Sequence, residues 1–124
     1  MTTPVSLASI AEELRGAARA NSSRRAARTV VGDQGHQVRQ TVIALAQDAT
    51  MSEHEAPGEG TLYVMEGRIE LSGSTGTLRI GAGDLAEIPR ERHSVRAVTD
   101  AVVLLTAMPR EFETRIAGNA AEGR

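Results

Sequence analysis

Between residues 29 and 107, the sequence consists of short β-prone runs, each closed by glycine, proline or polar turn residues. The runs recur at about the 8–12-residue spacing that is typical of β-sandwiches and β-barrels. No stretch with helical periodicity separates them, which argues against parallel βαβ units. The pattern predicts an antiparallel all-β domain over residues 29–109.

Individual strands are expected at residues 29–31, 38–46, 61–65, 85–88, 94–98 and 101–106. The runs 68–71 and 77–80 alternate polar and apolar residues across a Ser-Gly-Ser-Thr-Gly turn, which predicts an antiparallel hairpin with one buried face. Residues 101–106 are nearly all apolar, as expected for a strand that is buried on both faces.

The chain before the strands predicts a helix, because four apolar residues recur there at three- and four-residue steps: Leu7, Ile10, Leu14 and Ala17. Ser9 with Glu12 forms a candidate capping box, and Ser6 is the alternative cap. We assign residues 1–28 to this helix and a linker, within which the arginine-rich stretch 23–28 is a solvated linker or strand edge. Residues 110–124 are assigned to a short helix or frayed tail.

Composition excludes several classes of function. The chain has no cysteine, so disulfides, thiolate nucleophiles and cysteine-containing metal sites are excluded. Two aromatic residues and a net charge of −2 argue against nucleic-acid binding. No apolar run approaches the ~20 residues of a membrane span, and no signal peptide is evident. We expect a cytoplasmic protein that does not bind a membrane.

Two segments carry a more specific signal. Residues 54–67 read HEAPGEGTLYVMEG, and residues 83–93 read GDLAEIPRERH. Together they resemble the two sequence motifs of the cupin family, over roughly residues 38–108. The resemblance implies an all-β, cupin-like jelly-roll β-barrel, here with a short N-terminal helix.

The resemblance keeps only part of the family's metal-ligand pattern. With Gly67 as anchor, the two histidines of the first motif fall on His54 and Ala56, and its glutamate falls on Gly60. A second register makes His54 the second histidine and Glu59 the acid, but leaves one residue too many before Gly67. In the second motif Gly83, Pro89 and His93 are kept, while the closing asparagine falls near Ala97 and is absent.

The family pattern implies that His54 and His93 face one cavity from neighbouring strands. A metal (Fe, Mn, Ni or Zn) would need a further donor, for which Gln40 and Glu59 are the candidates. Arg92 is a candidate ligand-binding residue, within a cationic rim that also includes Arg39, Arg90 and Arg96. His36 lies in a glycine-rich turn and is expected to be exposed, with capping of the barrel mouth as the alternative.

Three functions remain open from the sequence. The first is binding of a small polar or anionic molecule in a cavity lined by His54 and His93, with weak or absent metal binding. The second is a metal-dependent enzyme, such as an oxygenase or isomerase, acting on a small oxygen-bearing substrate. The third is a sensing or structural barrel without chemistry. Sheet edges with few proline guards and no lysine predict a homodimer.

Overall fold

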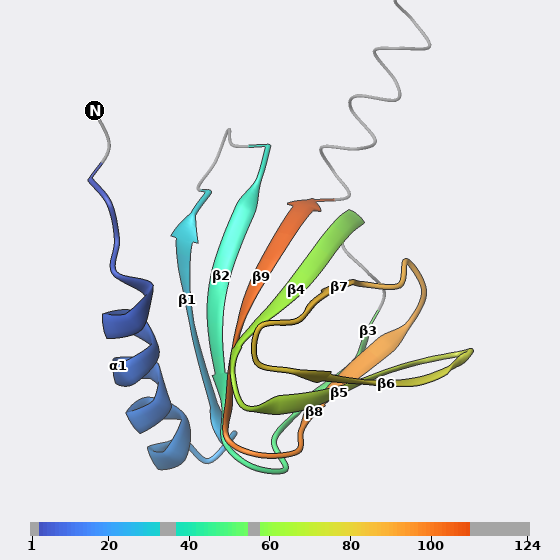
Figure 1. Cartoon of the computed structure of the whole chain (residues 1–124), viewed down its shortest axis with the longest axis horizontal. Coiled ribbons are helices and arrows are strands. Elements are labelled where there is room, and N and C mark those ends of the chain that lie inside the picture. The colour runs from blue at the N-terminus through green and yellow to red at the C-terminus, as the bar shows by residue number, and fades with distance from the viewer. Residues whose placement is uncertain (1–2, 33–36, 55–57, 110–124) are drawn as a thin grey trace, which may run out of the picture.

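The computed structural model describes residues 3–32, 37–54 and 58–109. In this part of the chain one helix is followed by nine strands (Figure 1). Their bounds are α1 Leu7–Ala20, β1 Arg25–Val31, β2 Arg39–Leu45, β3 Thr50–His54, β4 Gly58–Glu66, β5 Arg68–Gly73, β6 Gly76–Gly81, β7 Leu85–Glu87, β8 His93–Ala97 and β9 Ala101–Pro109. The predicted helix or tail over 110–124 lies outside the described residues.

The strands form two antiparallel sheets that enclose one apolar core. The five-stranded sheet has the order β1-β2-β9-β4-β7, and the four-stranded sheet has the order β3-β8-β5-β6. The core between them is built from aliphatic side chains, including Ile43, Leu62, Val64, Ile69 and Leu71. This is the jelly-roll arrangement expected from the sequence, and the predicted hairpin is present as β5 and β6.

Strand β9 is covered on both faces, which explains its nearly continuous apolar sequence. Val103 points into the core between the sheets. Val102, the adjacent residue, points outward and packs under α1 with Leu14 and Val42. Since α1 lies along the outer surface of the five-stranded sheet, at β1 and β2, residues of both parities are buried in the first part of β9, at 101–103 (Figure 1).

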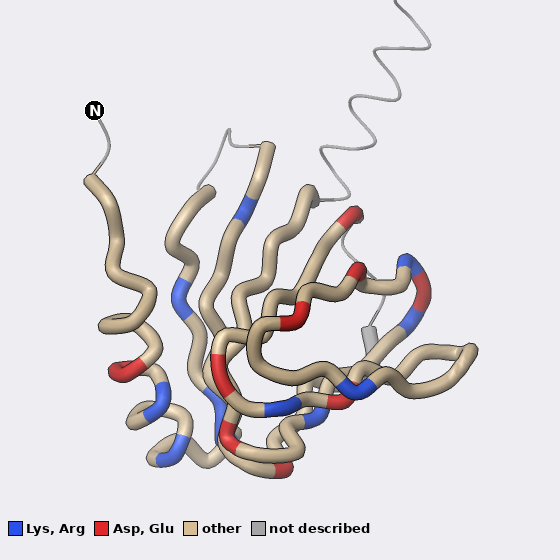
Figure 2. Tube along the Cα trace, viewed as in Figure 1, with Lys and Arg blue, Asp and Glu red and all other residues tan. Residues whose placement is uncertain are grey.

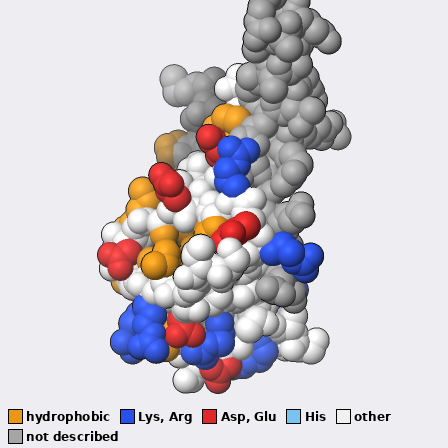
Figure 3. Space-filling view, turned by 90° about the vertical axis from the view of Figure 1, so that its right-hand side faces the viewer, with side chains coloured by type: hydrophobic (Ala, Val, Ile, Leu, Met, Phe, Trp, Pro, Cys, Tyr) orange, Lys and Arg blue, Asp and Glu red, His pale blue; other side chains and the backbone are white. Residues whose placement is uncertain are grey.

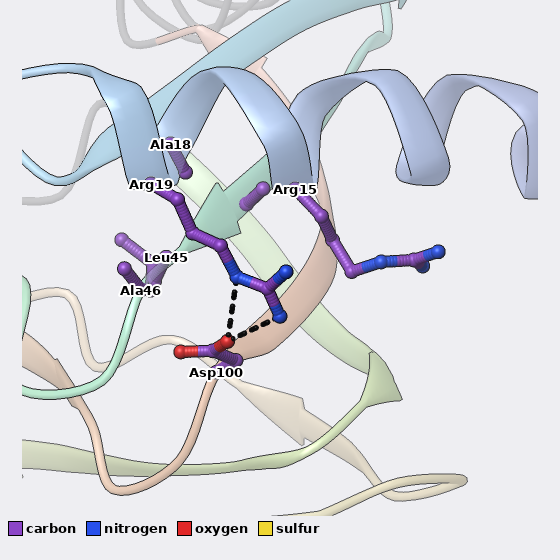
Figure 4. Close-up of a pocket in the computed structure, with 7 residues that line it drawn as sticks. Arg15, Ala18, Arg19, Leu45, Ala46 and Asp100 are labelled. Atoms are coloured by element: carbon purple, nitrogen blue, oxygen red, sulfur yellow. Dashed lines mark hydrogen bonds and ion pairs between the residues drawn. The ribbon is translucent and has the colours of Figure 1, made fainter.

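Helix α1 begins at the alternative cap, Ser6, whose side chain accepts a hydrogen bond from the backbone N–H of Ser9. The last turns are tied to the barrel by ion pairs. Arg19 bonds the Asp100 carboxylate at 2.7 Å, in the turn between β8 and β9 (Figure 4). Asp100 also accepts from the backbone N–H of Gln47. One carboxylate therefore joins the helix to two turns of the barrel.

The structure extends the sheets beyond the strands expected from the sequence. Strand β1 begins at Arg25, so the expected boundary between residues 28 and 29 falls inside a strand. It is an edge strand of the five-stranded sheet, one of the two alternatives for stretch 23–28. Strand β3 was not among the runs expected from hydrophobic patterning, because Met51 is its one large apolar residue.

Candidate functional site

His93 is the first residue of β8 and faces the barrel interior. On this strand His93, Val95 and Ala97 are buried, whereas Ser94 and Arg96 are partly exposed. His93 is only 4% exposed. Among the residues whose side chains the structure describes, no other polar or charged residue is buried. A buried imidazole is costly unless its nitrogens have partners, so its hydrogen bonds bear directly on its role.

The Nδ1 atom of His93 lies 3.0 Å from the backbone carbonyl oxygen of Glu91. A carbonyl oxygen can only accept, so Nδ1 carries the proton and donates it. In the neutral ring this tautomer leaves the lone pair on Nε2. Any backbone carbonyl can supply this contact, so no sequence signal identified Glu91 as the positioning partner of His93.

The backbone of His54 is the register partner of His93 across β3 and β8. The pairing depends on an irregularity in β3, because Met51 lies opposite Val95 and the register shifts between Met51 and His54. In a regular ladder, the residue opposite His93 would be Glu53. One extra residue in the strand, a β-bulge, therefore brings the two motif histidines opposite each other.

Gln40 is not brought together with His93. On β2, Ile43 belongs to the barrel core, whereas Val42 belongs to the cluster beneath α1. Gln40 has the same parity as Val42 and therefore lies on the outer face of the sheet. There its side-chain amide donates to the Thr106 hydroxyl at 3.2 Å.

Glu59 is likewise directed away from the interior. Its side chain is 67% exposed and forms an ion pair with Arg90, with Nη1 and Oε1 3.9 Å apart. The interior position beside it is occupied by Gly60, where an added Cβ would contact the Cδ1 atom of buried Ile88 at 3.2 Å. When the first motif is aligned on Gly67, the family's glutamate also falls on Gly60. The inward-facing residue at this position therefore has no carboxylate.

The arginines expected at the cavity rim lie in different surroundings. Arg96 is on the outer face of β8 and bonds Glu70 at 2.9 Å and Asp48 at 2.8 Å. The hydrogen bond from Arg96, reinforced by Arg79, lowers the pKa of the Glu70 carboxyl below its usual value. Figure 2 shows basic and acidic positions along the four-stranded sheet. These ion pairs link β5, β6 and β8 on the outer face of the four-stranded sheet.

Arg92 remains at the entrance to β8. It is exposed, directly precedes His93, and forms no ion pair within the described part of the chain. Arg39 is exposed at the start of β2. His36 lies outside the described residues. Arg92 is therefore the predicted rim arginine that lies nearest to His93 in the sequence.

The metal-ligand candidates can be compared only where side chains are described, which leaves out those of residues 52–58. Among the side chains that the structure describes, no group of three histidine or acidic residues is positioned to hold a metal ion. Gln40 and Glu59, the two candidate third donors, both lie on outer faces. Stable sites usually need three protein ligands or more, so these residues do not form a complete ligand set around His93.

Described residues line at least two concavities. One, of about 10 Å³, lies between α1 and the barrel beside Arg19 and Asp100, and has about the room that one water needs (Figure 4). The other, of about 240 Å³, lies at the open edge of the five-stranded sheet and is lined by Glu59, Gly60, Thr61, Glu87, Ile88 and Arg90. No helix in the described part of the chain has the length and apolar character needed to cross a bilayer.

Comparison with known proteins identifies the fold. No family model matches the sequence, and no curated protein matches it either. Among solved structures, a cupin superfamily protein from Desulfitobacterium hafniense is similar with a TM-score of 0.69 at 15% identity, over 88% of this chain and 93% of that one. An RmlC-like cupin from Desulfovibrio desulfuricans is similar with a TM-score of 0.64 at 23% identity, over 86% and 94%.

A third similar structure is an RmlC-like cupin from Shewanella frigidimarina, with a TM-score of 0.61 at 19% identity, over 68% of this chain and 76% of that one. These similarities, together with the two facing antiparallel sheets, show that the chain has the cupin fold. The fold expected from the two motifs is thus confirmed.

Proposed function

We propose that this chain binds a small polar or anionic molecule in the barrel, at a site formed by His54 and His93, with weak or absent metal binding. The observation that carries the proposal is the cross-strand pairing of the two residues at the bulge in β3. A bulge disrupts the ladder locally, and such irregularities are common next to functional sites.

The state of His93 supports a binding role. Its Nδ1 proton is donated to the Glu91 carbonyl, and this hydrogen bond fixes the orientation of the ring at the start of β8. Arg92, next in the chain, adds an exposed guanidinium suited to carboxylate or phosphate groups. With one tyrosine and one phenylalanine in the chain, little ring surface exists for a flat aromatic ligand.

A metal-dependent enzyme is the second candidate, and one observation favours it. Metal-binding histidines usually donate their other ring N–H to a carbonyl or carboxylate, as His93 does to Glu91. Against this stands the outward placement of Gln40 and Glu59. The two candidates differ in expected metal content, which decides between them.

The test combines a ligand panel with metal analysis, on protein purified without an affinity tag. Thermal unfolding is followed with inorganic phosphate and small mono- and dicarboxylates as probes. A probe at ten times its Kd stabilises by about 1.4 kcal/mol. That should raise Tm by roughly 4–5 °C for a domain of this size.

The double variant His54→Ala/His93→Ala should lose this shift and keep its fold. Ser94→Ala is the matched control, because Ser94 follows His93 on β8 and is on the opposite face. A double variant that responds to the probes as wild type does would refute the site. Elemental analysis showing about one Fe, Mn, Ni or Zn per chain, lost in the double variant, would instead support the enzyme.

A further inference from the structure

The loop between β7 and β8, residues 88–92, is fastened to the turn of the β5–β6 hairpin by the Glu91 side chain. The backbone N–H of Ser74 donates to one oxygen of the Glu91 carboxylate at 3.1 Å, and the Ser74 hydroxyl donates to the other at 2.6 Å. The second distance is in the short range of hydrogen bonds to a charged acceptor. Figure 1 shows the hairpin turn and the loop on the same side of the barrel, and Figure 3 views that side, where charged side chains are interspersed with uncharged surface.

The approach of Glu91 to the hairpin depends on a glycine. Gly73 is the last residue of β5, and a Cβ at that position would lie 2.9 Å from the carboxylate oxygen Oε1 of Glu91. It would lie 3.8 Å from the Cγ atom of Pro89, which is an ordinary contact. The absence of a side chain at Gly73 therefore lets the Glu91 carboxylate reach Ser74.

Glu91 also holds His93, through its backbone. The carbonyl oxygen of Glu91 accepts the Nδ1 proton of His93 at 3.0 Å. The register of β5 with β8 runs to the pair Ser72 and Ser94, so this ladder stops one residue before His93. Glu91 supplies the next connection between the two strands, with its carboxylate on the hairpin and its carbonyl on the imidazole.

We propose that Glu91 is a positioning residue for the site at His93, and that the β5–β6 turn fixes the imidazole ring through it. This inference rests on the proposed function for the role of His93. A backbone carbonyl can orient a ring only if it is itself held in place, and residues 88–92 lie outside the strands. The contact with Ser74 anchors this loop, so the ring is oriented before a ligand binds. Preorganisation of this kind lowers the cost of ordering a site on binding.

The tautomer of His93 tests the proposal without any ligand. Two-bond proton–nitrogen NMR correlation spectra of the full-length chain distinguish Nδ1–H from Nε2–H rings, and His93→Ala identifies the signal. At about pH 8.5, where an ordinary histidine is neutral, the wild type should show the Nδ1–H form. Glu91→Ala and Gly73→Ala should each shift the ring towards the Nε2–H form that free histidine favours. The methyl group of Gly73→Ala meets the free end of a flexible side chain, so the barrel itself need not move.

Two further variants separate positioning from general damage to the hairpin. Glu91→Gln keeps an oxygen that accepts from the Ser74 N–H, so it should retain the wild-type tautomer. Thr77→Ala is the matched control, because it removes the 2.9 Å hydrogen bond between Thr77 and Ser72 on the same hairpin and leaves Glu91 in place. Thermal unfolding checks that every variant is folded.

Binding of the phosphate and carboxylate probes gives a second measurement. Glu91→Ala should raise the Kd about ten-fold, as removal of a group that orients a ligand-binding histidine does in metal sites, while Glu91→Gln and Thr77→Ala stay within about three-fold. An unchanged His93 tautomer in Glu91→Ala would overturn the proposal. So would an equal change in Thr77→Ala, or a changed tautomer with an unchanged Kd. A wild type that binds no probe refutes the proposed function instead, and the tautomer then still decides whether Glu91 positions the ring.

Discussion

Gly67 joins β4 to β5, and we expect its replacement by alanine to be the most damaging single-methyl change in the described barrel. Its backbone has φ +78°, in the left-handed region that side chains with a Cβ rarely adopt. An added Cβ would also overlap the carbonyl oxygen of Asp100 and lie 2.9 Å from both Ala101 Cα and Thr99 Oγ1. Two of these three atoms are backbone, so they can yield only if the turn before β9 moves.

The cost of Gly67→Ala has two parts. The left-handed conformation costs about 1–2 kcal/mol for alanine, and forcing extra volume into a packed site costs about 1–3 kcal/mol. Together they predict a loss of roughly 2–5 kcal/mol, against a total stability of about 5–15 kcal/mol for a typical domain. For a chain of this length, this corresponds to a fall in Tm of roughly 6–20 °C.

Two other glycines separate the two parts of this cost. Gly83 has φ +91° but no atom within 4 Å of an added Cβ, so Gly83→Ala should show the conformational part alone, about 1–2 kcal/mol. Gly16 lies inside α1 with open space around it, so Gly16→Ala should stabilise the protein by roughly 0.5–1 kcal/mol.

Urea unfolding of the three variants, followed by circular dichroism, measures the series under one set of conditions. From most to least stable, the expected order is Gly16→Ala, wild type, Gly83→Ala and Gly67→Ala. If Gly67→Ala proves no less stable than Gly83→Ala, the close approach of the turn before β9 is not a source of destabilisation, and the reasoning fails.

Three further predictions concern the core, the helix and the surface charges. Leu62→Ala removes a side chain that is 2% exposed in the barrel core and should cost about 2–5 kcal/mol in urea unfolding. Ser6→Ala removes the cap of α1 and should cost about 0.5–2 kcal/mol, with a matching loss of helical signal on heating; an unchanged midpoint would contradict the assigned cap. Arg96 lowers the pKa of the Glu70 carboxyl, and Arg19 lowers that of Asp100. Because the unfolded chain then binds protons more readily, this stabilisation is present above the unfolded pKa, about 4, and is lost as the pH falls through the lowered folded values. Glu70→Gln should therefore flatten the acid side of the stability–pH curve, and an unchanged slope would contradict the ion-pair role.

Much of the barrel could be predicted because its signals are local. The β5–β6 hairpin follows from period-two alternation on both sides of a glycine-rich turn. The burial of β9 on both faces could be predicted from its continuous apolar run, because a strand with one face in water alternates apolar and polar residues. The two motifs then identified the fold, because they fix the positions of Gly67, Gly83 and Pro89 in the turns between strands.

The candidate site could be predicted only in part, because its geometry depends on contacts between distant segments. Alternation along β2 shows that Gln40 and Val42 share a face, but it does not reveal that α1 covers that face. The same ambiguity applied to Glu59 on β4, where the inward-facing position belongs to Gly60. Strand β3 has too few apolar residues to be recognised without its partner, β8.

The sequence by itself determined which chemistry is available. It supplies three histidines, no thiol, almost no aromatic surface, and a strand pattern that closes into an antiparallel barrel. Tertiary structure decided which side chains face inward and which backbones meet. A period of two sets only relative facing, and the absolute choice depends on packing against α1 and the opposite sheet. The pairing of His54 with His93 likewise depends on one extra residue in β3, whose position is defined only by the register with β8.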